Sequence, residues 1–122
     1  MTLAYIIDEN RSPLYKELML HHESHLTVWR VGEPGVPPIS SPDPDILVWC
    51  EEQDCILVTN NRASMPQHLK IHLDQGRHMP GIFILKDEMT IGETIEELIL
   101  IAETAFENEY QDRIAYLPIS YD

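Results

Sequence analysis

Acidic side chains occur at two places where a parallel sheet would bring them together. Asp8 and Glu9 directly follow a short apolar run, residues 3–7, of the kind that forms a buried strand. Asp43 and Asp45 open a predicted helix that comes after the second predicted strand. Ligands of open parallel sheets bind beyond the carboxyl ends of the strands. The pattern therefore predicts that Asp8, Asp43 and Asp45 share one edge of a sheet.

Several carboxylates around one small volume are what Mg²⁺ or Mn²⁺ needs at a phosphate that is being cleaved. Each position also has a structural explanation. Asp43 precedes Pro44 and is typical of a helix N-cap, while Asp45 in the first turn interacts favourably with the helix dipole. Glu9 should point to the opposite side from Asp8 if the extended conformation continues. Asp8 has no obvious structural partner, which favours a metal-binding role for it.

A polar segment follows the third predicted strand and consists of Thr59, Asn60, Asn61 and Arg62. Threonine and asparagine at such a position suit the binding of a phosphate or a base. Arg62 and Arg11 are the best phosphate-binding candidates, because guanidinium presents a bidentate fork to that group. Salt bridges to the many nearby acidic side chains are an equally open explanation for both arginines.

Two groups of histidines suggest weaker metal hypotheses. His68 and His72 lie four residues apart on a predicted helix and would share one face. No glutamate lies between them to act as a general base, and boundary histidines with satisfied hydrogen bonds are the favoured alternative. His21, His22 and His25 lie at a helix-to-strand turn, where a solvated loop is favoured over a zinc site.

Strand and helix patterns alternate along the chain, which is typical of a parallel α/β sheet. The predicted strands are residues 3–7, 26–30, 55–58, 81–85 and 113–119, and the predicted helices are residues 13–22, 43–53, 64–76 and 91–106. Capping boxes are predicted at Ser64 and Thr90. The fifth strand should lie at a sheet edge, because Pro118 cannot donate to a ladder.

The composition indicates one domain, residues 1–122, with a net charge of −13 from 21 acidic and 8 basic side chains. Such a charge argues against non-specific binding to DNA or membranes, which relies on a basic surface. No apolar run approaches the roughly 18 residues that span a membrane. Met1-Thr2-Leu3 does not begin a signal peptide, so a cytoplasmic location is expected. Cys50 and Cys55 are expected to be small buried hydrophobes.

Three segments together resemble the small stand-alone PIN-like proteins, a branch of the PIN nuclease superfamily. These segments are Ile-Asp-Glu-Asn-Arg-Ser-Pro at 7–13, Asp-Pro-Asp-Ile-Leu at 43–47 and Ile-Leu-Val-Thr-Asn-Asn-Arg at 56–62. The likeness extends to 64–66, 78–81, 91–92 and 116–118. It implies a three-layer α/β/α sandwich with a mostly parallel sheet of four to five strands. It also implies a Mg²⁺- or Mn²⁺-dependent ribonuclease, and many small bacterial members are toxins of toxin–antitoxin pairs.

The resemblance assigns Asp8 as the first metal-binding acid and Asp43 as the second. The usual third acid corresponds to Asn61, which is a departure from the pattern. An asparagine carbonyl can coordinate a metal but carries no charge, and either Asp45 or Glu9 is expected to compensate. The resulting catalytic prediction comprises Asp8, Asp43, Asp45 and Asn61, with Arg11, Thr59, Asn60 and Arg62 binding substrate.

Three functions remain open at this level. The leading one is a metal-dependent ribonuclease, and the second is a non-catalytic module of the same fold that binds RNA, a nucleotide or an antitoxin-like protein. The third is a receiver-like signalling domain, which needs an aspartate where this chain has Thr59-Asn60. A homodimer is also expected if the edge strand 114–119 pairs across a two-fold axis.

A proline-rich connection, residues 33–44, holds five of the nine prolines. Long connections of this kind are often functional. We interpret the segment as a lid or a partner-docking strip next to the acidic site, with a semi-rigid spacer as the alternative.

Overall fold

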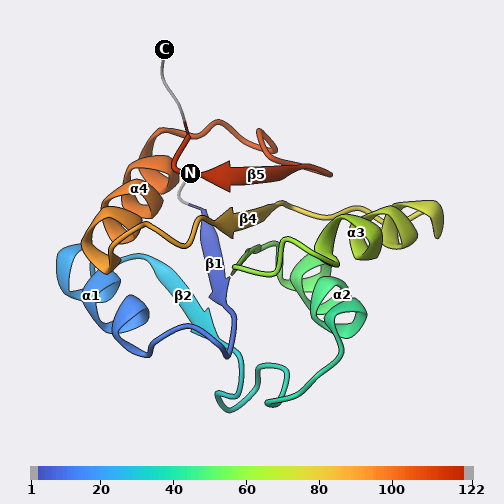
Figure 1. The fold of residues 1–122 in the computed structure, drawn as a ribbon, viewed down its shortest axis with the longest axis horizontal. Helices are drawn as coiled ribbons and strands as arrows, with labels where there is room; N and C mark the ends of the chain where they lie inside the picture. The colour runs from blue at the N-terminus through green and yellow to red at the C-terminus, as the bar shows by residue number, and fades with distance from the viewer. Residues whose placement is uncertain (1–2, 120–122) are drawn as a thin grey trace.

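The computed structural model describes residues 3–119; Met1, Thr2 and residues 120–122, including the residues on which the signal-peptide prediction rests, lie outside that range. Nine elements alternate regularly along it (Figure 1). They are β1 (Ala4–Ile7), α1 (Leu14–His22), β2 (Thr27–Arg30), α2 (Asp43–Gln53), β3 (Ile56–Thr59), α3 (Met65–Asp74), β4 (Ile82–Leu85), α4 (Ile91–Thr104) and β5 (Ile114–Leu117).

The five strands form one sheet in the order β2-β1-β3-β4-β5, and every neighbouring pair is parallel. Helices cover both faces of the sheet, so the predicted three-layer α/β/α architecture is confirmed. β5 lies at an edge, as predicted from Pro118. Among the described residues, no helix is long and apolar enough to cross a membrane.

Strand side chains alternate between two cores because successive residues of a strand point to opposite faces. Tyr5 and Ile7 of β1 pack with α1 and α4, whereas Ile6 packs with α2 and α3. In β3, Val58 lies on the α1/α4 face and Leu57 on the α2/α3 face. The same alternation determines on which face of the sheet the side chains just beyond each strand lie.

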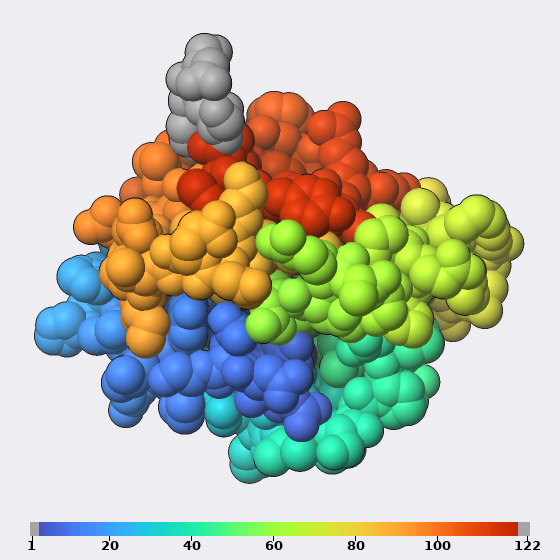
Figure 2. All heavy atoms as spheres, viewed as in Figure 1, coloured from blue at the N-terminus to red at the C-terminus, as the bar shows by residue number. Residues whose placement is uncertain are grey.

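The crossover through α4 differs from the other three. The chain moves in one direction across the sheet from β2 to β3, β4 and β5, with α2 and α3 on one face but α4 on the other. From β1 to β2 the chain moves in the opposite direction, and this crossover passes through α1 on the same face as α4. The crossovers through α1, α2 and α3 therefore have one hand, and the crossover through α4 has the opposite hand. Because parallel crossovers are nearly always right-handed, this placement of α4 is a distinctive feature of the fold. It puts α4 beside α1 (Figures 1 and 2).

Four local predictions at helix ends differ from the structure. Pro42, and not Asp43, is the N-cap of α2, in which Asp43 is the first residue. Pro13 is the N-cap of α1 and not its first residue, and the Ser12 hydroxyl accepts a hydrogen bond from Leu14 N. Ser64 forms no capping box, because its hydroxyl binds a neighbouring side chain described below. Phe106 lies beyond the end of α4 with 69% of its surface exposed, so it does not extend the buried stripe of that helix.

The capping box of α4 is confirmed and carries a stability prediction. Thr90 Oγ1 accepts a hydrogen bond from Glu93 N at 3.1 Å, and Glu93 Oε1 accepts one from Thr90 N at 2.9 Å. We expect Thr90→Ala to lower the free energy of unfolding by about 1 kcal/mol in urea denaturation. Thr104→Ala, in the exposed last turn of α4, is the control and should have a much smaller effect. Equal losses in the two variants would contradict the capping role.

Candidate functional site at the switch point between β1 and β3

The candidate site lies where the chain reverses its direction across the sheet. From β1 the chain passes to β2 on one side and then returns past β1 to form β3 on the other. The carboxyl ends of β1 and β3 therefore flank a topological switch point, the usual place for a ligand in this architecture. Asp8 directly follows β1, and Thr59 is the last residue of β3.

Asp8 and Thr59 are joined by a direct hydrogen bond. The Thr59 hydroxyl donates to Asp8 Oδ2 at 2.8 Å, and Asp8 N donates to the carbonyl oxygen of Val58 at 3.0 Å. Both side chains continue the alternation of their strands on the α2/α3 face. The edge of the sheet thus holds the Asp8 carboxylate in a defined orientation toward the first turns of these helices.

Asn61 connects this strand end to the starts of α2 and α3. Its backbone N–H donates to Thr59 Oγ1 at 3.2 Å. Its side-chain nitrogen Nδ2 donates to Asp43 Oδ2 at 3.0 Å and to Ser64 Oγ at 2.7 Å, and its Oδ1 accepts from Ser64 N at 3.3 Å. Asp8 and Asp43, 35 positions apart in sequence, are therefore linked through Thr59 and Asn61.

His68 is the fifth side chain of this network, which we call the switch-point network (Asp8, Asp43, Thr59, Asn61 and His68). Its Nε2 lies 3.6 Å from Asp43 Oδ2, and 26% of its side chain is exposed. His72 is not its partner. It is buried, with 4% exposed, and its Nε2 lies 2.9 Å from the carbonyl oxygen of His78. The two histidines thus have separate partners, which agrees with the interpretation as satisfied boundary residues.

The other two predicted acids, Glu9 and Asp45, have surroundings of their own. Asp45 is exposed and lines a shallow groove with Pro38 and Trp49, about 200° around α2 from Asp43. Glu9 Oε1 accepts a hydrogen bond from Ser40 N at 2.8 Å, which fastens the proline-rich connection beside the site.

The two predicted phosphate-binding arginines differ in their surroundings. Arg62 is exposed, directly after Asn61, where it is accessible to a ligand. Asn60, partly exposed, accepts a backbone hydrogen bond from Arg62 N at 2.9 Å. Arg11 lies on the β1–α1 connection; its Nε is buried and has no hydrogen-bond partner among the described residues, as is also true of Arg30 Nε. Arg30 contacts the same connection through a 3.4 Å hydrogen bond to the Arg11 carbonyl oxygen.

The oxygen atoms available to a divalent cation at this site come from two carboxylates. No group of three or more His, Cys, Asp or Glu side chains within residues 3–119 is arranged to hold a metal ion. Asp8 and Asp43 nevertheless use only Oδ2 in their hydrogen bonds to the described residues, so each keeps Oδ1 for another ligand. The side-chain carbonyl oxygen of Asn61 accepts one hydrogen bond, from Ser64 N at 3.3 Å. A cation at this site would therefore be held through the Oδ1 atoms of these two carboxylates and completed by other oxygen ligands.

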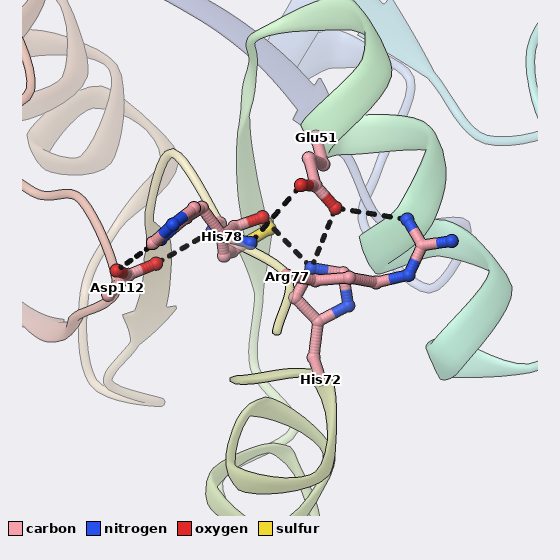
Figure 3. A network of polar contacts seen from close by, with 6 residues as sticks. Glu51, His72, Arg77, His78 and Asp112 are labelled. Atoms are coloured by element: carbon pink, nitrogen blue, oxygen red, sulfur yellow. Dashed lines mark hydrogen bonds and ion pairs between the residues drawn. The ribbon is translucent and has the colours of Figure 1, made fainter. Parts of the chain in front are cut away.

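Sequence reasoning missed a second polar network at the opposite edge of the sheet (Figure 3). Glu51 near the end of α2 accepts hydrogen bonds from Arg77 Nη1 and from His78 N, both at 3.1 Å, and lies 3.3 Å from His72 Nε2. His78 Nδ1 lies 2.9 Å from Asp112 Oδ2. These residues are far apart in sequence and show no motif, so only the folded chain reveals them. The network ties α2, α3 and the segment before β5 together.

This second network predicts a pH dependence of stability. The hydrogen bond with Asp112 raises the pKa of His78 above its ordinary value of 6.5. Burial would raise the pKa of Asp112, but hydrogen bonds from His78 and Met79 lower it below 3.8. The His78 contribution is complete below pH 6.5 and is lost as the pH rises through its raised pKa, whereas the Asp112 contribution is lost only in acid.

We therefore expect the free energy of unfolding to fall as the pH rises above 6.5 and through the raised pKa of His78. The measurement is a series of urea denaturation curves across this range. Asp112→Asn should give a flatter dependence, because its amide does not hold the proton of His78. An unchanged slope in that variant would contradict the assignment.

Comparison with known proteins does not place the chain in a family. No family model matches it, and neither the curated proteins nor the solved structures include a significant match.

Proposed function

We propose that the protein is a Mg²⁺- or Mn²⁺-dependent ribonuclease of the PIN-like type, with Asp8 and Asp43 as its metal-binding carboxylates. The observation that supports this most is the switch-point network, in which Thr59 and Asn61 hold both carboxylates while each keeps one free oxygen. Mg²⁺ in proteins is commonly held by one or two carboxylates together with substrate phosphates and waters. Two protein carboxylates are therefore sufficient once an RNA phosphate is present.

Each residue has a definite part in this proposal. Thr59 orients Asp8 and Asn61 orients Asp43, while His68 borders the same carboxylate. Arg62, exposed next to Asn61, binds a phosphate of the RNA through its guanidinium. A bound divalent cation supplies charge neutralisation at the phosphate and lowers the pKa of its water. Asp45 is not needed for this arrangement, because it faces a separate groove.

The proposal extends to the cellular setting. We place the protein in the cytoplasm, consistent with two free and buried cysteines, Cys50 and Cys55. RNA is its proposed substrate and an antitoxin-like protein its proposed partner. A homodimer would form through the outer edge of β5, which pairs with β4 alone within the described chain.

The first test is calorimetric titration of the purified protein with Mn²⁺, with and without a single-stranded oligonucleotide of non-cleavable phosphorothioate RNA. We expect weak binding of Mn²⁺ alone and clearly tighter binding when the oligonucleotide is present. The second measurement is cleavage of a fluorescent RNA in Mg²⁺, in Mn²⁺ and in EDTA. Absence of metal binding under both conditions would contradict the proposal.

A non-catalytic RNA-binding module is the second candidate, and one observation favours it. Asn61 replaces the third acid that the resemblance leads one to expect. Both hydrogens of its Nδ2 are used by Asp43 and Ser64, and its Oδ1 accepts one hydrogen bond, from Ser64 N. Such a site has less negative charge to hold a cation and retains polar groups for a nucleotide. RNA binding of equal strength in EDTA and in Mg²⁺, without cleavage, would favour this candidate over the nuclease.

A further inference from the structure

A groove separates α1 and α4 on the face of the sheet opposite the switch-point network. Its volume is about 420 Å³. Four apolar side chains form its floor, namely Leu18, Ile95, Ile99 and Leu100. Leu100 is 47% exposed, although it belongs to the longest helix of the described chain. Gly92 also lines it, and a Cβ at that position would meet Thr90 Oγ1 at 4.0 Å, an ordinary van der Waals contact. The groove is thus an accessible apolar surface between two helices.

The rim of this groove is acidic. Glu23, Glu96 and Glu103 line it, and neither lysine nor arginine does. The Glu23 carboxyl group, by hydrogen bonding and by its charge, raises the pKa of Glu103 above its ordinary value. His25 Nδ1 lies 3.4 Å from Glu23 Oε2, but 60% of the His25 side chain is exposed. His22 also lines the groove, so three glutamates and one histidine are the titratable groups among the lining residues, and the balance is acidic.

We propose that this groove is a docking site for a basic amphipathic helix of a partner protein. An apolar floor between two helices accepts the apolar face of a third helix, which is a recurrent mode of recognition. The three glutamates would face lysine or arginine side chains at the edges of that helix, and complementary charge favours association and correct orientation.

The charge of the groove argues against other occupants. RNA is a polyanion and would be repelled by three carboxylates. A second copy of this chain carries a net charge of −13 and only eight basic residues, so it would bring mostly like charge. The docking site lies on the α1/α4 face and does not include the switch-point network. The inference therefore stands or falls independently of the ribonuclease proposal.

The test uses a fluorescent 18-residue peptide of leucine and lysine with helical amphipathic spacing, measured by anisotropy against the full chain. A scrambled peptide of the same composition is compared with it. We expect the amphipathic peptide to bind at least about tenfold more tightly than the scrambled one, because only it presents an apolar face. Equal binding of the two peptides would mean non-specific attraction to an acidic protein and would overturn the proposal.

Variants of matched charge locate the binding surface. Glu96→Gln with Glu103→Gln should weaken binding about tenfold, whereas Glu88→Gln with Glu107→Gln, exposed positions outside the groove, should change it by less than about twofold. Leu100→Gln should weaken binding without a change in net charge. Equal losses in the two double variants would overturn the proposal. A dimer in sedimentation that Leu100→Gln converts to a monomer would also overturn it, because a second copy would then occupy the groove.

Discussion

Asp8→Asn is expected to abolish metal-dependent RNA cleavage and to remove Mn²⁺ binding at the switch point. Asp8 provides one of only two carboxylates in the switch-point network, and its free Oδ1 is a proposed metal ligand. Loss of groups that merely support metal ligands typically costs about 10- to 100-fold in affinity or activity. Loss of a ligand should exceed about 100-fold on the same scale. The measurement is the initial rate of RNA cleavage together with calorimetric Mn²⁺ titration.

The Asp8→Asn variant should remain folded. The Thr59 hydroxyl can donate to the asparagine carbonyl oxygen as it does to Asp8 Oδ2, and the backbone bond from position 8 to Val58 is unaffected. Asp45→Asn is the matched control because it removes the same charge from an exposed position on another face of α2. We expect near-normal cleavage by the control. Full activity in Asp8→Asn would show that the cleavage arises elsewhere or from a contaminant.

Asn61→Asp is expected to have two opposite effects that depend on metal. In EDTA, the new carboxylate would lie against Asp43, where Asn61 Nδ2 now donates at 3.0 Å, and the bond to Ser64 Oγ would also lose its donor. Replacing an amide donor by a like charge at a partly buried site should lower the free energy of unfolding by about 1–3 kcal/mol. Urea denaturation in EDTA measures this loss.

With Mn²⁺ present, binding of the cation to Asn61→Asp should offset this loss of stability. Three carboxylates would then surround the cation, so Mn²⁺ should bind more tightly than it does to the natural chain. Saturation at about 100 times the dissociation constant adds about 2.7 kcal/mol to folding. We therefore expect the melting temperature of Asn61→Asp to rise strongly with Mn²⁺, together with its cleavage rate if a metal limits activity.

Asn60→Asp is the control for this experiment. It introduces the same charge one residue earlier, at a partly exposed side chain that forms no hydrogen bond with another of the described residues. We expect a small change in stability and no gain in Mn²⁺ affinity. Equal Mn²⁺ stabilisation of both variants would indicate a general charge effect. It would count against a specific metal site at Asp8 and Asp43.

The fold class can be predicted from local sequence patterns, because burial and capping depend on residues that are close together in the sequence. Fully apolar runs such as 56–58 and 82–85 predict buried strands, and the regular spacing of Ile95, Leu98 and Ala102 predicts the buried face of α4. The Thr90 capping box is likewise local, because its two hydrogen bonds join residues three apart. Burial and capping act over a few residues, so the sequence alone indicates them.

The face on which α4 lies was decided by tertiary packing. Its apolar stripe shows that it covers a sheet but not which face, because both faces of the central strands are equally apolar. The usual hand of a crossover would have put α4 beside α3. In the structure α4 packs with α1, and the acidic groove lies between these two helices. No sequence motif predicted this groove.

The candidate site likewise combines features that the sequence predicts with features that only tertiary packing decides. The sequence predicted that Asp8 and Asp43 lie at one edge of the sheet. Their connection through Asn61, which lies 18 positions after Asp43, exists only in the folded chain. Ser64 illustrates the physical reason. Its sequence context is typical of a capping box, but its hydroxyl oxygen accepts a hydrogen bond from Asn61 Nδ2 at 2.7 Å instead. A polar side chain in a loop has several partners within reach, and the packed elements around it decide which one it binds. The sequence thus determined the elements and the strand-end acids, whereas tertiary structure alone decided which of those acids are held together.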